Sequence, residues 1–115
     1  MDVRLREEIY RLHAQICNGL ADPNRILILY TLAEAPHNVS ELAAKLKLPQ
    51  PTISRHLKTL RERGMVRAER EGQTVVYSLA DRRLIEALDL LRAFMADSLA
   101  SQSALARTVS EERTP

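Results

Sequence analysis

Cysteine and glycine are scarce in this sequence, and their scarcity excludes several kinds of site. Cys17 is the only cysteine in 115 residues, so no disulfide can form within the chain, and we expect a cytoplasmic protein. The three glycines are isolated and form no phosphate-binding loop, and no nucleophile, histidine and carboxylate have the spacing of a catalytic motif. We therefore expect that the chain is not an enzyme and needs no cofactor.

Aromatic residues and long apolar runs are also lacking. With three tyrosines, one phenylalanine and no tryptophan, the core must consist mainly of Leu, Ile, Val and Ala, a composition that favours packed helices. No apolar run approaches the ~20 residues that cross a membrane, and the N-terminus is too charged for a signal peptide. We expect one domain over residues 1–106 and a flexible polar tail over residues 107–115.

Charge is unevenly distributed along the chain, although the formal net charge is only +2. Between Ser40 and Ala80 there are eight Lys or Arg residues and four Asp or Glu residues, so this segment carries +4. The segments before and after it each carry −1. The basic middle segment is either a candidate surface for a polyanion such as nucleic acid or an ordinary solvated surface.

Two helices are expected in the first third of the sequence. Asp22 and Pro23 are typical of a helix start, as N-cap and first helical residue, and the helix that follows is apolar nearly all round, which predicts burial. The helix before it spans about residues 4–19. Its apolar residues share one stripe at helical spacing: Leu5, Ile9, Leu12, Ile16 and Leu20.

A helix-turn-helix is expected next. Asn38 begins a capping box before a third helix over residues 39–47. Pro49 and Pro51 disfavour helical backbone in the residues before them, and Pro51 presets φ for the first turn of a fourth helix over residues 51–63. Two helices joined by so short a turn form a helix-turn-helix.

After the fourth helix the pattern changes from helical to alternating. Residues 65–70 and 74–79 are expected to form two strands joined by a tight turn around Gly72. A last helix begins near Asp81 and carries a second apolar stripe. The predicted fold is therefore mainly α with a small β-hairpin: four helices, two strands and a fifth helix.

The outer face of the fourth helix is rich in basic and hydrogen-bonding side chains. Ile53, Leu57 and Leu60 are spaced to face the core, which predicts that the polar residues face outward. Such residues can reach base edges in the major groove of double-stranded DNA while a basic hairpin contacts the flanking backbone or minor groove. This arrangement is a winged helix-turn-helix; the alternative is a winged-helix module that binds protein or RNA without operator specificity. The candidate DNA-binding residues are Gln50, Thr52, Ser54, Arg55, His56, Lys58, Thr59, Arg67, Arg70 and Gln73.

The sequence resembles the ArsR/SmtB-type repressors of bacteria and archaea. The resemblance covers about residues 20–97 and rests on LADPNRILIL in the second helix, VSELAAKL in the third, LPQPTISRHLKTLRERGMV in the fourth and EGQTVVYSL in the hairpin. It implies a homodimer that pairs through the first and last helices and binds an operator inverted repeat. It also implies that an inducer, often a metal ion, releases the DNA.

The positions that hold the inducer in such repressors carry no metal ligands here. Ala43 and Lys45 replace the cysteine pair of the arsenic and cadmium/lead sensors. Arg83 and Phe94 replace the two histidines of the zinc sensors, and Tyr30 replaces the second-helix cysteine of the sulfide sensors. We therefore expect no metal site, and the inducer stays unidentified.

Cys17 is the remaining inducer or redox candidate. His13 precedes it by four residues on the same face of the first helix, and in a dimer two such pairs could approach each other. The alternative is that Cys17 is a small buried hydrophobic residue, as free cysteines commonly are.

Overall fold

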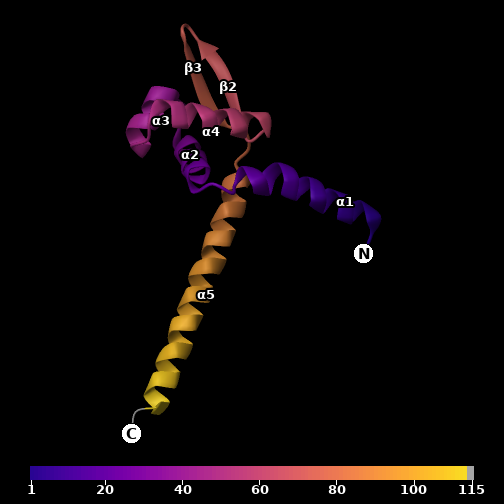
Figure 1. Ribbon diagram of the computed structural model, residues 1–115, viewed down its shortest axis with the longest axis vertical. Coiled ribbons are helices and arrows are strands. Elements are labelled where there is room, and N and C mark those ends of the chain that lie inside the picture. Colours follow the sequence, from indigo (N-terminus) through magenta and orange to yellow (C-terminus); the bar gives the residue numbers. More distant parts are fainter. Residues whose placement is uncertain (114–115) are drawn as a thin grey trace. The chain divides into compact units, whose positions relative to one another are not determined.

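The computed structural model describes the backbone of residues 1–113 and the side chains of residues 1–108. The chain forms two compact units, Met1–Arg82 and Arg83–Pro115. The predicted fold class is confirmed, with one short strand more than expected. Figure 1 labels most of the helices and strands. In chain order the elements are α1 (Val3–Leu12), η1 (His13–Cys17), α2 (Pro23–Glu34), β1 (His37–Asn38), α3 (Val39–Leu46), α4 (Gln50–Glu62), β2 (Val66–Glu71), β3 (Thr74–Leu79) and α5 (Arg83–Arg113).

The helix-turn-helix consists of α3, a short turn and α4. Asn38 caps α3 in a complete capping box: its side chain accepts a hydrogen bond from the Glu41 backbone N–H at 2.8 Å, and the Glu41 carboxylate accepts from the Asn38 N–H at 2.9 Å. Lys47 ends α3 in the left-handed region, with a φ of 55°. The chain then enters α4 through Pro49 as N-cap and Pro51 in the first turn. The predicted turn is therefore confirmed.

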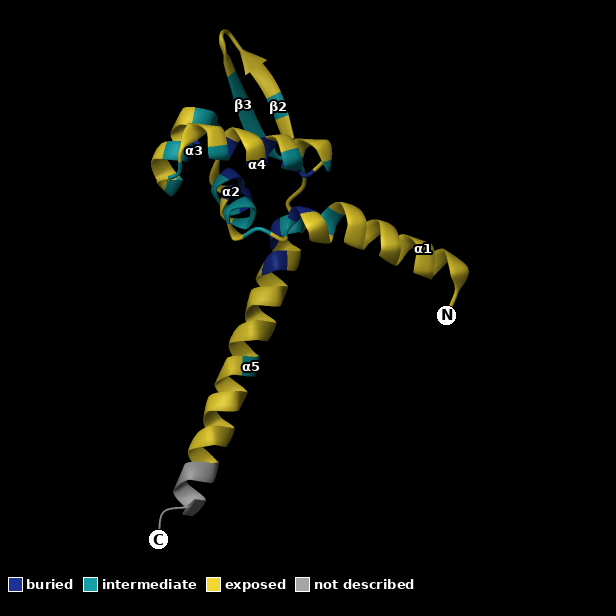
Figure 2. Cartoon of the chain, in the orientation of Figure 1, coloured by how far each residue is buried: buried dark blue, intermediate teal, exposed yellow. Residues whose placement is uncertain are grey.

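The core of the first unit lies where α2, α3 and α4 meet. The spacing of Ile53, Leu57 and Leu60 predicts burial, and all three side chains of α4 are fully buried. Figure 2 shows many exposed residues on α3 and α4, whereas α2 is mostly half-buried or buried. Full burial of each such side chain stabilises the fold by ~1.5–3 kcal/mol, so α4 is held firmly along one face. The buried apolar residues of this unit are Ile28, Leu29, Leu32, Leu42, Ile53, Leu57, Leu60, Met65 and Val66.

The hairpin is part of a three-stranded antiparallel sheet with the order β1-β3-β2. Gly72 and Gln73 form the loop between β2 and β3, and Gly72 has a φ of 65°, which other residues rarely adopt. In β1, which was not predicted, His37 pairs with Tyr77 of β3. The His37 side chain is buried, and its Nδ1 lies 2.6 Å from the Ala35 carbonyl oxygen. This histidine therefore packs within the fold and bonds to the backbone.

A π-helical turn, η1, interrupts the first helix, which was expected to be regular. The backbone N–H of Asn18 bonds to the carbonyl of His13, five residues earlier. An α-helix would give that N–H to Ala14, so the Ala14 carbonyl is released and accepts from the Arg63 guanidinium at 2.6 Å. The backbone carbonyl of Gln15 accepts a hydrogen bond from the same guanidinium at 3.0 Å. The side-chain amide of Gln15 donates one to the Arg63 carbonyl at 3.1 Å. The first helix is thus bonded to the C-terminal end of α4.

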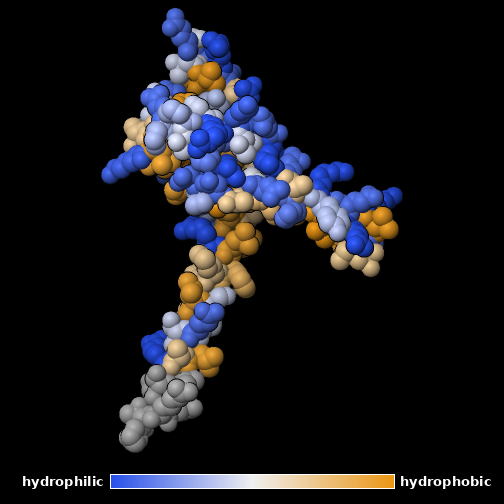
Figure 3. Space-filling model, in the orientation of Figure 1, coloured by the Kyte–Doolittle hydropathy of each residue, from blue (hydrophilic) through white to orange (hydrophobic). Residues whose placement is uncertain are grey.

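The apolar stripe of α1 is exposed. No residue of α1 is buried: 45% of the surface of Leu5 and of Ile9 is accessible, and 51% of that of Leu12. Figure 3 shows hydrophobic side chains on the surface of this helix. About half of the surface of each of these three side chains is therefore accessible to solvent.

The second unit is formed by α5. Ile85 and Leu88 near its start are buried, and large hydrophobic residues further along are exposed. Helical backbone is assigned as far as Arg113, and residues 114–115 lie outside the described part. The flexible tail predicted for residues 107–115 stays a prediction. None of the described helices combines the length and apolar character needed to span a membrane. The exposed residues of α5 are Leu90, Leu91, Phe94, Met95, Leu99 and Leu105.

Candidate nucleic-acid interface

The outward face of α4 carries six of the seven candidate residues in this segment. Gln50 joins the start of α4 to α3, since its side-chain amide donates to the Ser40 hydroxyl at 3.3 Å. The Thr59 hydroxyl donates to the backbone carbonyl of Arg55 at 3.3 Å and is therefore already used within the helix. Basic and hydroxyl groups thus project from a helix whose other face is packed in the core. Gln50, Ser54, Arg55 and Lys58 are exposed, and Thr52 and Thr59 are half-buried.

His56 is the exception, and the prediction that it faces outward is wrong. Only 6% of its surface is exposed. Its Nδ1 lies 3.4 Å from a guanidinium nitrogen of Arg25, and its Nε2 lies 3.9 Å from Oδ1 of Asp22. The reason is helix geometry: position 56 is three residues after Ile53 and four before Leu60, which places it within the core-facing arc.

Asp22 and Arg25 hold His56 against the start of α2. Asp22 is the N-cap of α2, as predicted, and accepts a hydrogen bond from the Asn24 backbone N–H at 2.8 Å. Arg25 also donates to the carbonyls of Gly19, at 2.8 Å, and Asn18, at 3.0 Å. Because a guanidinium can only donate, the Nδ1 of His56 must accept, which leaves the proton of the neutral ring on Nε2.

Burial lowers the pKa of His56 below its ordinary value of about 6.5. The carboxylate of Asp22 opposes this lowering of the pKa, and the positive charges of Arg25 and Arg55 add to it. His56 is therefore neutral at pH 7. A second proton, on Nδ1, would face the guanidinium of Arg25.

The hairpin presents Arg67, Arg70 and Gln73, and all three are exposed. Arg67 and Arg70 lie on opposite faces of the sheet, because they are three residues apart in one strand. Arg70 pairs with Val75, which shares a face with Tyr77 two residues later. Tyr77 lines a hollow against α4, so Arg70 lies on the face of the hairpin directed toward α4 and Arg67 on the other.

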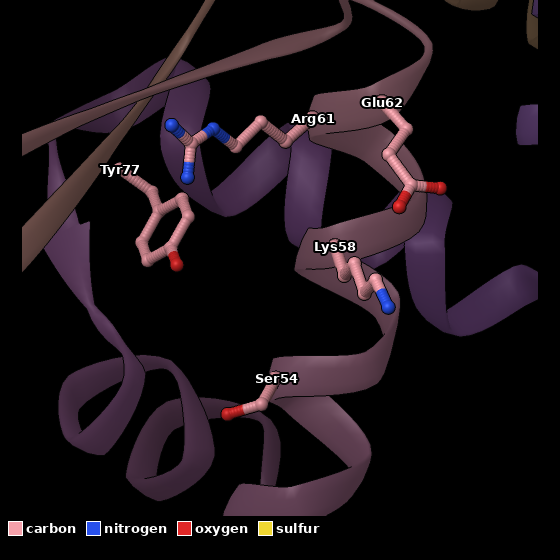
Figure 4. Close-up of a pocket in the computed structure, with 5 residues that line it drawn as sticks. All are labelled: Ser54, Lys58, Arg61, Glu62 and Tyr77. Carbon is pink, nitrogen blue, oxygen red and sulfur yellow. The ribbon is translucent and has the colours of Figure 1, made fainter.

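The hollow between α4 and β3 has a volume of about 510 Å³. Three of its lining residues, Arg61, Glu62 and Tyr77, were not among the predicted DNA-binding residues. A signal for Arg61 was present, because it follows Ser54 by seven residues and Lys58 by three on one helix face. No local signal marks Tyr77, whose place opposite α4 depends on how the sheet packs. The lining residues, drawn in Figure 4, are Ser54, Lys58, Arg61, Glu62 and Tyr77.

Cys17 and His13 both lie in η1, and both are exposed. The alternative that Cys17 is a buried hydrophobic residue is therefore wrong for the single chain. Because a π-helical turn is wider than an α-helical one, a spacing of four residues no longer places the two side chains directly above each other. Over the described residues, no group of three or more His, Cys, Asp or Glu side chains could hold a metal ion. A role in sensing stays a prediction.

A helix-turn-helix whose second helix exposes basic side chains, followed by a basic hairpin, defines a winged helix-turn-helix regulator. The family described as "Bacterial regulatory protein, arsR family" matches residues 22–68, which include α2, α3 and α4. The chain belongs to this family, as the resemblance in the sequence implies.

Individual proteins are similar to the chain over longer stretches. The chain is 43% identical over 77 residues to the HTH-type transcriptional repressor SmtB of Mycobacterium tuberculosis, covering 67% of this chain but only 57% of SmtB. It is 35% identical over 100 residues to the uncharacterized HTH-type transcriptional regulator Rv0081 of the same species, covering 86% of this chain and 88% of Rv0081. The crystal structure of M. tuberculosis Rv0081 matches with a TM-score of 0.74, at 34% identity, over 83% of this chain and 96% of that one. The NMR structure of the homodimeric winged helix-turn-helix domain of Mb0332 from Mycobacterium bovis matches with a TM-score of 0.73, at 25% identity, over 86% and 91%.

Proposed function

We propose that this chain is the subunit of a homodimeric repressor in which α4 occupies the major groove of an operator and the hairpin contacts the flanking backbone. The observation that carries the proposal is the division of α4 into a buried face and an outward face with Ser54, Arg55 and Lys58. A module for protein or RNA would not need such a face, and the relatives give that alternative no support. Since the regulated DNA lies in the cytoplasm, we expect the protein there.

The exposed apolar residues of α1 and of α5 support the homodimer. Their exposure in the single chain, with about half of Leu5, Ile9 and Leu12 accessible, would be relieved by pairing of two copies. Mb0332, which is similar to this chain, is homodimeric. In a two-fold dimer the two α4 helices would read half-sites about 34 Å apart, and the operator would be an inverted repeat.

The proposed function includes release of the DNA when an inducer binds to the repressor. The positions of Ala43, Lys45, Arg83 and Phe94 offer no ligands for zinc, cadmium or arsenite. An inducer that acts through a thiol would have to act through Cys17, which is exposed.

Binding to the duplex DNA upstream of its own gene tests this function. Fluorescence anisotropy with labelled duplexes compares the wild-type protein with Arg55→Ala, which should lose ~1–3 kcal/mol of specific binding if Arg55 contacts a base. Arg11→Ala is the matched control, because it removes the same charge from an exposed position of α1. A wild-type protein that prefers none of these duplexes to a scrambled one would contradict the proposal.

A further inference from the structure

The hollow between α4 and β3 suits a group that is anionic and rich in oxygen. Arg61 and Lys58 contribute positive charge, and the hydroxyls of Ser54 and Tyr77 can donate hydrogen bonds. In Figure 4 the Arg61 side chain extends toward Tyr77, the Ser54 hydroxyl lies on the same side of α4, and the carboxylate of Glu62 points away from Tyr77. The donors of Arg61, Ser54 and Tyr77, from two different elements, therefore converge, whereas Lys58 and the one acidic lining residue, Glu62, lie at the rim.

These donors are not engaged elsewhere. In the part of the chain that the structure describes, the side chains of Ser54, Lys58, Arg61 and Tyr77 form no hydrogen bond or ion pair. By contrast, Arg25 and Arg63 are both bonded to backbone carbonyls. An anion in the hollow would thus gain its contacts without the loss of any bond within the protein.

The hollow also lies on the path expected of the DNA backbone. With α4 in the major groove and the hairpin at the adjacent minor groove, the line of phosphates that separates the two grooves must pass between α4 and the hairpin. The hollow lies between these two elements. Arg70, on the same face of the hairpin, continues the positive charge toward its tip.

We propose that this hollow seats a phosphodiester of the DNA backbone, bound by Arg61, Ser54 and the hydroxyl of Tyr77, with Lys58 at the rim. The inference rests on the proposed function and adds a specific contact to it. Since the donors come from both α4 and β3, one phosphate fixes the position of the helix and of the hairpin on the duplex together. The contact itself carries no sequence information.

Two variants test this seat in a titration of the wild-type and variant proteins with operator and scrambled duplexes at several salt concentrations. Arg61→Ala should lower the salt slope of binding by about one unit and weaken both duplexes by the same factor. Tyr77→Phe removes an uncharged donor, so it should weaken both about tenfold and leave the salt slope unchanged. Arg11→Ala should change neither quantity. Thermal melts of all variants should coincide with that of the wild-type protein.

Modified DNA locates the phosphate. Operator duplexes are prepared with a single neutral methylphosphonate at each backbone position in turn. The wild-type protein should lose affinity at a defined position in each half-site, and Arg61→Ala should show no further loss at that position. Losses that add fully to the effect of Arg61→Ala at every position would overturn the inference.

The outcomes separate this inference from the proposed function. If the wild-type protein has no preference for the operator, the proposed function fails and the seat fails with it. If it binds the operator and both variants keep its affinity and salt slope, the function stands and the seat is wrong. Inorganic phosphate, titrated at constant ionic strength, should compete only weakly with DNA. Tight phosphate binding to the free protein that Tyr77→Phe abolishes would identify a free-anion site and overturn the assignment to DNA.

Discussion

The Nδ1 atom of His56 lies 3.4 Å from a guanidinium nitrogen of Arg25, so a neutral imidazole joins the helix proposed to read DNA to the start of α2. Arg55, the preceding residue, is exposed, whereas His56 is buried. Two adjacent residues of α4 therefore have separate tasks: Arg55 is directed outward, and His56 holds the helix in place.

This division predicts opposite effects for two neighbouring alanine substitutions. His56→Ala should lower the free energy of unfolding by ~1–3 kcal/mol, because it leaves a donor of Arg25 without its acceptor. Arg55→Ala should change that free energy by no more than ~0.5 kcal/mol, since Arg55 is exposed, and should weaken operator binding. Urea unfolding followed by circular dichroism measures the first quantity and anisotropy the second. Similar losses of stability in both variants would refute the division.

The lowered pKa of His56 predicts that stability depends on pH. Below its ordinary pKa of about 6.5 the unfolded chain takes up a proton at His56, whereas the folded chain resists protonation. The free energy of unfolding should therefore be highest above pH 6.5 and fall as the pH falls below it. His56→Gln removes this titration and should flatten the profile between pH 5 and 8, taken as an approximate window below and above that pKa. An unchanged slope in the variant would assign the pH dependence to other groups.

The hairpin arginines are expected to contact phosphates. Neutralising Arg67 and Arg70 together should lower the salt slope of DNA binding by about two units and leave the sequence preference unchanged. Because they lie on opposite faces of the sheet, the single variants should differ, and Arg70, on the face toward α4, should account for at least one of these units. Anisotropy titrations over a salt series measure the slopes. A changed preference at constant slope would mean that the hairpin reads bases.

A substitution at Cys17, the only cysteine in the sequence, tests whether thiol chemistry releases the DNA. We expect stoichiometric zinc to leave the operator complex intact, because the usual ligand positions hold Ala43, Lys45, Arg83 and Phe94. If a thiophilic or thiol-reactive inducer acts, Cys17→Ser should abolish its effect and leave the affinity of the free protein for the operator nearly unchanged.

The control for Cys17 is a pair of measurements on the same variant. Operator release, titrated with cadmium or a thiol-reactive reagent, is compared with thermal melting. Since Cys17 is exposed, Cys17→Ser should melt within a few degrees of the wild-type protein. Tight zinc binding that persists in Cys17→Ser and releases the operator would contradict the expected loss of the histidine-type site.

Local signals in the sequence predict the helix starts and the turn, because a cap acts within a few residues. Asp22 before Pro23, and Asn38 with Glu41, form the bonds that their spacing predicts. The strand β1 could not be predicted in this way. It has two residues, and it exists because His37 pairs with Tyr77, forty positions later in the chain.

The errors at the candidate site have the same origin. His56 was placed outward because of its polarity, although its spacing from Ile53 and Leu60 favours the core; Asp22 and Arg25, which make its burial favourable, belong to another helix. The turn η1 likewise depends on Arg63, which takes the carbonyl that the turn releases. Tyr77 became a candidate only once its strand was placed opposite α4.

The bonds from Arg63 to the carbonyls of Ala14 and Gln15 couple the first helix mechanically to α4. A rotation of the first helix about its axis must either stretch these bonds or turn α4 with it. In a dimer that pairs through its first helices, the angle at which the two protomers cross and the distance between their DNA-reading helices would then change together. The guanidinium of Arg63 and the two main-chain oxygen atoms that it binds would transmit that change.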